Sequence, residues 1–361
     1  MDLAIYGAQS IALGAYTAIC NLYPMREIKC FLVTDRGANP EYLSEVPVLE
    51  MAAFAKGLSE EEKGNIEILI ATPENVMSEI EAGLDACGLC CHVRLTSTRW
   101  AELMSYHYAA DRKYLPLAAL PIGYHEAKLH IFMAKFYKDT PLTTAYHMPE
   151  WIAPIQAGAS LCKERVADIL DCDGENISAK NVNYSELTAL YWIWKNILVQ
   201  NSPNDKNEFY GLSHYRRLLE LSEDDRMKLV DNEVDVVLPY PMPYEPNIEM
   251  HHKRYLADSD WDALVTALTE LQPEYADYLS QVLQQQYLYN YNIILAKKKV
   301  LTDYCEWLFP ILERVENLSI PKGCDRQDRY IGYMGETLTT LYFMMNRNRL
   351  NITYAGCRFL T

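Results

Sequence analysis

The residues best suited to chemistry follow a short apolar stretch in the segment EFYGLSHYRR. The apolar part predicts a strand over 209–213, which delivers His214, Tyr215, Arg216 and Arg217 at its carboxyl end. Ligands of open α/β sheets bind at such strand ends, and the forked donors of arginine match a diphosphate. The histidine can donate to a phosphate, ligate a metal or hold a structural hydrogen bond. Because adjacent residues of an extended chain point to opposite faces, we expect only one arginine to enter a cleft.

A second polar cluster occurs in the segment DCDGENISAKNVNYSELTALYWIWKN, which spans residues 171–196. We predict a polar loop and then a helix over 186–196 that Ser185 caps. Unpaired N–H groups and the helix dipole make such a start a candidate anion site. The alternative is a capped core helix with a solvated entry loop. The side chains of this loop that we consider as ligand contacts are Asp171, Asp173, Asn176 and Asn183.

Two glutamates are candidates for a general base, the group that takes a proton from an attacking hydroxyl. They are Glu186, at the start of the predicted helix, and Glu336, on a periodic segment near the carboxyl end. An ordinary surface glutamate is the alternative for Glu336. Asp171 and Asp173 form an Asp-x-Asp pair and are the best candidates for holding a divalent metal, Mn²⁺ or Mg²⁺.

The elements of the first half alternate between strands and helices. Apolar and periodic stretches predict strands over 3–6, 28–33, 66–71 and 89–95 and helices over 11–22 and 72–86. This alternation implies right-handed βαβ units and a parallel sheet. The first turn contains Gly7, but Gln9 and Ala12 stand where a dinucleotide fingerprint has glycine. We therefore favour a Rossmann-like domain that binds something smaller than NAD, or only partners.

The second half begins after a linker over 116–124 that contains two prolines and a glycine. Its apolar stretches are 128–133, 152–157, 209–213, 234–239 and 287–298, and its predicted helices are 161–170, 186–196, 301–315 and a periodic segment over 329–345. Asn290 lies near the start of the last predicted strand, and Arg329 begins the last periodic segment. We place the domain boundary between residues 125 and 126.

Composition excludes several classes of protein. The 361 residues are 50% hydrophobic, so a packed core is feasible, and the net charge of −16 argues against bulk nucleic-acid binding, which needs a basic face. No apolar run reaches the ~20 residues that span a bilayer. No secretory signal is visible, so we expect a cytoplasmic chain with ten reduced cysteines. The one CxxC, Cys87 with Cys90, lacks the second ligand pair of a zinc site.

Five blocks in the second half carry a family resemblance. In chain order they are NVNYSELTALYWIWKN, YGLSHYRR, LYNYNIILAKK, YCEWLF and DRYIGYMGETL. Together they resemble the bacterial family labelled capsular or exopolysaccharide biosynthesis protein, first described as a domain of unknown function. IAPIQAGASL and DGENIS resemble the opening of that family, so the resemblance covers about residues 128–361. The first hundred residues are loosely similar to small Rossmann-like domains that precede sugar-modifying enzymes in bacterial polysaccharide clusters.

The resemblance implies a GT-A-like glycosyltransferase, and one branch of the family is associated with galactofuranosyl transfer from a UDP-sugar. Carried onto this chain, it implies as positions to test Asn183, Glu186, His214, Tyr215, Arg216, Arg217, Asn290, Arg329 and Glu336. The family has a histidine–lysine pair near the first strand of this domain, whereas this chain reads MAKF over 133–136. That difference affects part of the nucleotide pocket.

GT-A enzymes usually hold a metal on an Asp-x-Asp after a central strand, and the metal neutralises the leaving diphosphate. The comparable strand here ends in HYRR. We therefore expect Arg216, with His214, to stabilise the leaving phosphates. Asp171 with Asp173 is the metal-dependent alternative.

These observations predict an α/β fold with a small N-terminal Rossmann-like parallel sheet (1–125) and a C-terminal GT-A-like domain (126–361). The expected activity is transfer of a sugar, galactofuranose being the candidate, from a UDP-linked donor to a glycan hydroxyl in bacterial surface polysaccharide synthesis. In one version of this hypothesis the acceptor is linked to a lipid. The protein would then reach it by associating peripherally with the inner face of the membrane. The alternatives are a non-catalytic glycan-binding or scaffold protein and an NAD-dependent sugar oxidoreductase, against which the missing glycines argue.

Overall fold

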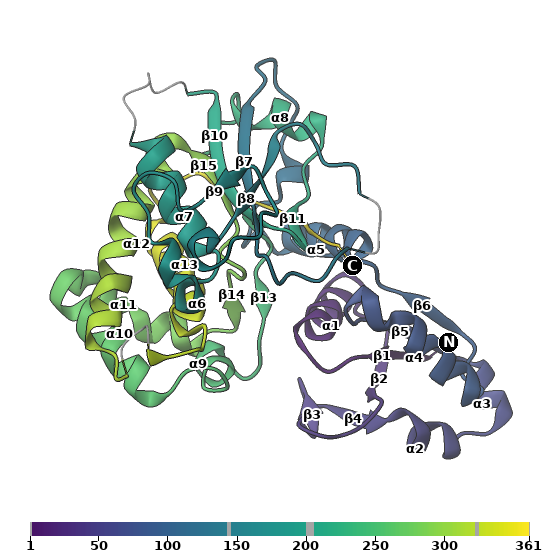
Figure 1. Cartoon of the computed structure of the whole chain (residues 1–361). Coiled ribbons are helices and arrows are strands. Elements are labelled where there is room, and N and C mark those ends of the chain that lie inside the picture. Colours follow the sequence, from purple (N-terminus) through teal and green to yellow (C-terminus); the bar gives the residue numbers. More distant parts are fainter. Residues whose placement is uncertain (1, 143–145, 200–205, 322–324, 361) are drawn as a thin grey trace.

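The computed structural model describes residues 2–142, 146–199, 206–321 and 325–360. Two large β-sheets organise the chain, the first from residues 2–94 and the second from residues 128–359. In Figure 1 the first sheet and its helices lie at the lower right, and the larger second part lies above them and to the left. Both sheets contain runs of parallel strands connected through helices, which confirms the expected α/β fold class. The division at residues 125 and 126 stays a prediction.

The first sheet has the strand order β3-β4-β2-β1-β5-β6, and all neighbours are parallel except β3 and β4. Its strands are β1 (Asp2–Tyr6), β2 (Ile28–Val33), β3 (Tyr42–Leu43), β4 (Val46–Glu50), β5 (Ile66–Ile70) and β6 (His92–Arg94). Its helices are α1 (Ser10–Leu22), α2 (Met51–Lys56), α3 (Glu60–Gly64), α4 (Met77–Ala86) and α5 (Ser97–Asp111). The strand order reverses between β1 and β5, so the crevice beyond their carboxyl ends is the favoured ligand position of this Rossmann-like sheet.

The second sheet has the strand order β16-β12-β15-β10-β7-β8-β9. Its strands are β7 (Lys128–Lys135), β8 (Ile152–Gln156), β9 (Ile169–Leu170), β10 (Glu208–His214), β12 (Val236–Pro239), β15 (Ile294–Lys297) and β16 (Ile352–Ala355). β7 to β10 run parallel, and β15 is antiparallel to its neighbour β10. A hairpin joins β10 to β11 (Arg217–Leu219), which pairs with β17 (Cys357–Phe359), and β13 (Met242–Pro243) pairs with β14 (Tyr287–Leu288). This mixed, largely parallel sheet between helices is consistent with the expected GT-A-like α/β architecture.

The helices of the second part are α6 (Asn181–Tyr184), α7 (Leu187–Ile193), α8 (Glu223–Leu229), α9 (Ile248–His252), α10 (Asp258–Leu271), α11 (Pro273–Gln284), α12 (Lys298–Leu318) and α13 (Tyr330–Asn346). Helices α10 to α13 stand together on the side of the second sheet that faces away from the first sheet (Figure 1). The long amphipathic α12 and the mostly buried α13 pack against each other and fill that side with buried side chains.

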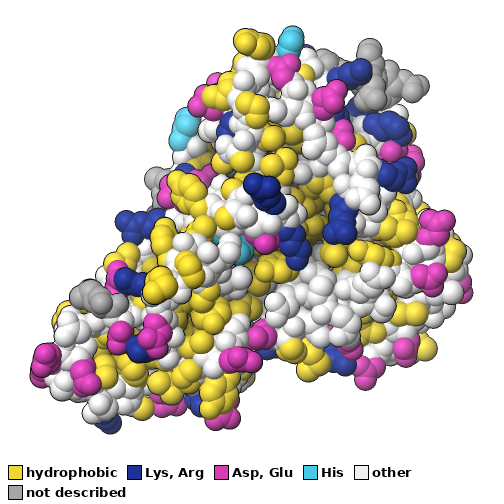
Figure 2. Space-filling view, turned by 180° about the vertical axis from the view of Figure 1, so that it is seen from behind, with side chains coloured by type: hydrophobic (Ala, Val, Ile, Leu, Met, Phe, Trp, Pro, Cys, Tyr) yellow, Lys and Arg dark blue, Asp and Glu magenta, His cyan; other side chains and the backbone are white. Residues whose placement is uncertain are grey.

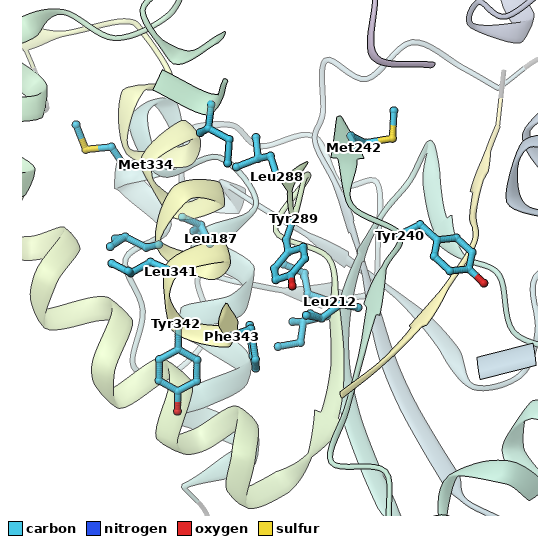
Figure 3. Packing of buried hydrophobic residues seen from close by; sticks show 14 of the residues in the cluster. Leu187, Leu212, Tyr240, Met242, Leu288, Tyr289, Met334, Leu341, Tyr342 and Phe343 are labelled. Atoms are coloured by element: carbon cyan, nitrogen blue, oxygen red, sulfur yellow. The ribbon is translucent and has the colours of Figure 1, made fainter. Parts of the chain in front are cut away.

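A continuous hydrophobic core holds the second sheet to its helices. Figure 3 shows Leu341 and Phe343 of α13 beside Leu187 of α7 and near Leu212 of β10, all members of one buried cluster. The same cluster extends through Tyr108 of α5 to the side chains of the first sheet. The two sheets therefore share buried packing.

Two predicted elements are wrong, each because local hydrogen bonds or backbone turns break the pattern. The predicted helix over 161–170 is an irregular loop that ends in β9, because the Gln156 side chain bonds to the Glu164 carbonyl at 2.9 Å and accepts the Val166 N–H at 3.0 Å. The predicted strand over 287–298 forms only β14 and β15. Positive φ angles of 70° at Tyr291 and 50° at Asn292 interrupt it.

Candidate active site

A pocket of about 510 Å³ lies where the parallel strands β7, β8 and β10 end side by side. Parallel strands carry their carboxyl ends to one edge of the sheet, and loops at that edge are free to present side chains to a ligand. The charged and polar residues that line it are Lys135, Lys138, Asp139, Asn181, Ser185, Glu186, His214, Tyr215, Arg216, Arg217, Gln327 and Arg329. The pocket thus gathers cationic side chains in a chain whose net charge is −16.

The segment HYRR is the tight turn between β10 and β11. His214 pairs with Arg217 across the hairpin, and Tyr215 and Arg216 form its tip. Because the chain turns here rather than running extended, both arginines line the pocket, and the expectation that only one would do so is wrong. The Nε atoms of Arg216 and Arg217 are buried and have no hydrogen-bond partner among the described residues. A buried donor without a partner is costly, so these two atoms favour an acceptor-rich ligand.

The surface around the middle of the molecule is hollowed on the face opposite to the view of Figure 1. Figure 2 shows Lys and Arg side chains around this hollow and hydrophobic side chains on its floor, while many acidic side chains lie toward the lower margins. Cations that cluster in a concave, low-dielectric region create a local positive potential that a negative overall charge does not cancel.

His214 and Glu186 lie within ion-pair distance of each other inside the pocket. His214 Nε2 lies 3.2 Å from Glu186 Oε2, and Asn292 donates from Nδ2 to Glu186 Oε1 at 2.7 Å. Burial favours the neutral carboxyl, but the charge and hydrogen bond of His214 and the hydrogen bond of Asn292 outweigh it and lower the pKa of Glu186 to about 2. Glu186 is therefore an ionised group that orients the His214 ring.

Arg329 closes the pocket from the start of α13. Its Nε donates to Ser185 Oγ at 2.8 Å, and one terminal nitrogen lies 3.7 Å from Glu186 Oε2. Ser185 joins α6 to α7 with a φ of 51°, so it does not cap a helix as predicted, and its hydroxyl faces the arginine instead. A non-glycine residue in this conformation is strained, and such strain is concentrated at functional sites.

Glu336 lies behind the pocket wall on α13. Its Oε1 accepts the backbone N–H of Tyr291 at 3.0 Å. Burial and the nearby negative charge of Glu186 raise the pKa of Glu336 to about 8, although the Tyr291 hydrogen bond and the charges of Arg217 and Arg329 oppose the rise. The two candidate glutamates thus have pKa values shifted in opposite directions, which is typical of paired acid and base roles.

Three asparagines predicted as donor contacts lie outside the pocket wall. Asn176 is exposed and bonds from Nδ2 to the carbonyls of Cys172 and Gly174, which folds the loop onto itself. Asn183 is buried and donates to the Arg326 and Asp328 carbonyls, so it positions the segment that carries Arg329.

The third, Asn290, is buried and donates to the Tyr244 hydroxyl at 2.6 Å. The Asn290 Oδ1 atom is buried without a partner among the described residues. Asn290 is not part of the pocket lining, so this acceptor lies outside the pocket.

Asp171 and Asp173 do not fit a divalent metal. Asp171 is fully buried, and its carboxylate accepts the N–H groups of Gly158 at 2.7 Å and Ala159 at 2.9 Å and the Ser178 hydroxyl. These bonds anchor the loop after β8, whereas Asp173 is exposed. No group of three His, Cys, Asp or Glu side chains in the described part of the chain is placed to hold a metal ion.

Several pocket residues escaped the sequence analysis. Lys135 ends β7, and Lys138 and Asp139 follow it, at the same sheet edge as His214. Their position after a predicted strand was a usable signal. Asn181 packs so closely on Gly158 that a Cβ there would lie 2.7 Å from Asn181 Cγ, and Gly158 also has a φ of +66°. Nothing in the sequence alone indicated that contact.

Comparisons with known proteins agree with this architecture. The family model described as "Domain of unknown function (DUF4422)" matches residues 142–347, more than half of the chain. No curated protein matches the sequence. A solved structure titled as the apo form of the bifunctional glycosyltransferase WbbM is similar with a TM-score of 0.54 and 24% identity. The alignment covers 65% of this chain and 45% of that one, so this chain spans less than half of the longer protein. This likeness shows the fold.

Proposed function

The chain belongs to the family described as Domain of unknown function (DUF4422), and we propose that it is a glycosyltransferase whose strand-end pocket binds a nucleotide-sugar donor. The observation that carries the proposal is the cationic turn at the end of β10, inside a pocket at the carboxyl ends of three parallel strands. The structural likeness to a protein titled as a glycosyltransferase supports the same class. UDP as the nucleotide and galactofuranose as the sugar follow from the family resemblance.

The two arginines of the turn stabilise the diphosphate that leaves the donor sugar. Breaking the bond between the anomeric carbon and the phosphate oxygen puts negative charge on that oxygen. Arg216 and Arg217 present buried Nε donors with no described partner, and His214 adds a third donor that Glu186 orients. Donors already fixed at the position where charge develops lower the barrier without reorganisation during the reaction.

Glu336 is the better candidate for the base of an inverting transfer. In that reaction the acceptor oxygen bonds to the anomeric carbon, the nucleotide leaves with the bonding electrons, and the hydroxyl proton passes to a carboxylate. A base works best when its pKa lies near the working pH. The pKa of Glu336, about 8, meets that condition, whereas Glu186, with a pKa of about 2, is too weak and is held by His214.

The acceptor we propose is a glycan hydroxyl, on a lipid-linked chain or a soluble one, in surface polysaccharide synthesis at the cytoplasmic side of the membrane. No helix in the described ranges is both long and apolar enough to cross a membrane.

The first test is calorimetric titration of the protein with UDP, once with Mn²⁺ and once with EDTA. We expect UDP to bind under both conditions. Arg216→Ala should weaken UDP binding by about 1.5–3 kcal/mol, the contribution of a charged hydrogen bond. The matched control is Arg349→Ala, because Arg349 is exposed and outside the pocket, and its UDP affinity should equal that of the unmodified protein. Absence of UDP binding, or unchanged affinity in Arg216→Ala, contradicts the proposal. Binding lost only in EDTA contradicts its metal-free form.

A further inference from the structure

A second cavity, of about 470 Å³, lies at the junction between the two sheets. One wall consists of the turn after β1, residues 7–11, and the segment after β5, residues 71–75. These are the carboxyl ends of the two strands between which the order of the first sheet reverses. This junction cavity therefore occupies the favoured ligand position of a Rossmann-like sheet.

The opposite wall is the far side of the HYRR turn. Arg216 and Arg217 line both the junction cavity and the strand-end pocket, so this turn lies between the two spaces, beside the segment 138–141, which also lines both. Among the described residues neither guanidinium makes an ion pair. One carboxylate, Glu74, also lines the cavity, but its Oε1 is held by the N–H and hydroxyl of Ser97, both at 2.7 Å, at the start of α5. The wall thus has an excess of positive charge.

The first sheet adds further donors to this cavity. Helix α1 is 13 residues long, its first turn has no acidic residue, and no side chain caps it. The Gln9 side chain bonds to Asn39 instead. In the segment after β5, the Thr72 hydroxyl is buried without a partner among the described residues. Free amides, an unused hydroxyl and two guanidinium groups around one space are the donors that a phosphate group needs.

Apolar side chains complete the cavity and connect it to the candidate base. Tyr291 stacks on the Arg217 guanidinium, 4.1 Å from its ring centre, and Phe359 and Leu360 lie beside it. The Tyr291 backbone N–H bonds to Glu336. A ligand in the junction cavity therefore lies next to the residue that holds the proposed base, on the side of the arginines away from the donor.

We propose that the junction cavity binds the phosphate or diphosphate group of the acceptor substrate, so that the HYRR turn separates donor diphosphate from acceptor phosphate. The identification of the ligand as an acceptor rests on the proposed function, whereas the anion site itself does not. The Rossmann-like sheet is then a substrate-binding part of the enzyme, and the arginines contact both substrates, one on each side of the turn.

The test uses the full chain saturated with UDP and titrated with inorganic pyrophosphate, and in a parallel arm with farnesyl diphosphate. We expect pyrophosphate to bind at one further site while UDP stays bound. Asn75→Asp places a negative charge on the junction cavity and should weaken this binding about tenfold or more. Thr72→Val should weaken it several-fold and should fold normally, because the lost hydroxyl has no described partner. Both variants should bind UDP like the unmodified protein.

The matched control is Gln327→Glu, which adds the same kind of charge to the strand-end pocket. It should weaken UDP and leave pyrophosphate almost unchanged. Tighter binding of farnesyl diphosphate than of pyrophosphate identifies a lipid-linked acceptor, and equal binding identifies a soluble phosphorylated one. The proposal is overturned if pyrophosphate finds no second site beside UDP, or if Asn75→Asp and Thr72→Val leave pyrophosphate binding unchanged. It is also overturned if the protein binds NAD and pyrophosphate displaces it. If the protein does not bind UDP but binds pyrophosphate, and Asn75→Asp weakens that binding, the proposed function is overturned while the anion site stands.

Discussion

Glu186 and Glu336 show how two identical side chains acquire different properties within one site. Glu186 lies 3.2 Å from His214 Nε2 and accepts a hydrogen bond from Asn292, whereas the Glu336 carboxyl accepts a hydrogen bond from the Tyr291 backbone N–H. The pKa of the first falls to about 2 and that of the second rises to about 8. At neutral pH the site therefore holds one carboxylate and one mostly neutral carboxyl.

This difference predicts how stability depends on pH. Between pH 6 and 8 the native protein retains a proton on Glu336 that the unfolded chain has lost, so the free energy of unfolding falls as pH rises. Glu336→Gln removes that decline, because glutamine resembles the protonated form. Relative to the unmodified protein, the variant should gain about 2 kcal/mol between pH 6 and pH 8, from the raised pKa of about 8. Urea unfolding at several pH values measures it.

The control is Glu81→Gln on α4, beside the first sheet, because the hydrogen bond and charge of Arg94 lower the pKa of Glu81. The stability that this lowering adds is lost only as pH falls through the lowered pKa, below the range of the experiment. The variant should therefore differ from the unmodified protein by the same amount at pH 6 and pH 8. A constant difference for Glu336→Gln as well would show that Glu336 is ionised at neutral pH.

At this scale the sequence identified the residues whose role depends on their immediate neighbours in the chain. His214, Arg216 and Arg217 follow one strand, so their place at a sheet edge could be predicted. The Asn292 bond to Glu186 spans 106 residues, and the Asn183 bond to the Asp328 carbonyl spans 145. Partners that distant depend on the packing of whole elements, which no local pattern encodes.

At the scale of elements, strands were predicted well wherever a continuous apolar run filled the middle of a sheet. β2 and β10 are examples, because buried strands need apolar residues on both faces. The predicted helix over 161–170 was wrong because a single side chain, Gln156, supplies hydrogen bonds that an irregular loop would otherwise lack. A loop that one polar side chain stabilises has no periodic sequence pattern. An analysis of periodicity therefore cannot predict such a loop.

The loop after β9 gives a prediction that separates structure from metal binding. Asp171 accepts two backbone N–H bonds from the loop after β8 and one hydroxyl bond from Ser178, all buried, whereas Asp173 is exposed. Asp171→Asn should lower the free energy of unfolding by about 2 kcal/mol or more, because a charge-assisted acceptor is lost inside the protein. Asp173→Asn should change it by less than about 0.5 kcal/mol, as for most surface substitutions.

Thermal unfolding of both variants, with and without Mn²⁺, measures these changes. A stabilisation by Mn²⁺ that both substitutions abolish would contradict the structural role and restore the metal site. A lower stability of Asp171→Asn alone, with no effect of Mn²⁺, agrees with the structural role of the hydrogen bonds to Asp171.

At the scale of the whole molecule, the two sheets are connected by more than a linker. One hydrophobic cluster contains side chains of the first sheet, of α5 and of the second sheet. The Tyr108 hydroxyl of α5 donates to the Pro241 carbonyl at 3.0 Å across this boundary, with the tyrosine completely buried. A ligand site at the junction requires such a fixed arrangement, because a phosphate held between two parts needs both walls at constant separation.

This packing predicts that the chain unfolds as one cooperative unit although its sequence divides into two α/β parts. Tyr108→Phe leaves the Pro241 carbonyl buried without its partner, which should cost about 1–3 kcal/mol. If the core is shared, this loss lowers the stability of both sheets equally.

Hydrogen exchange of peptides from β5 and from β10, measured through a urea series, should then show one common midpoint that moves to lower urea in the variant. Tyr106→Phe on the same helix is the control, because Tyr106 is 68% exposed. Separate midpoints for β5 and β10, with only one shifted by Tyr108→Phe, would show two independent domains and would leave the junction cavity without the fixed walls that its proposed ligand needs.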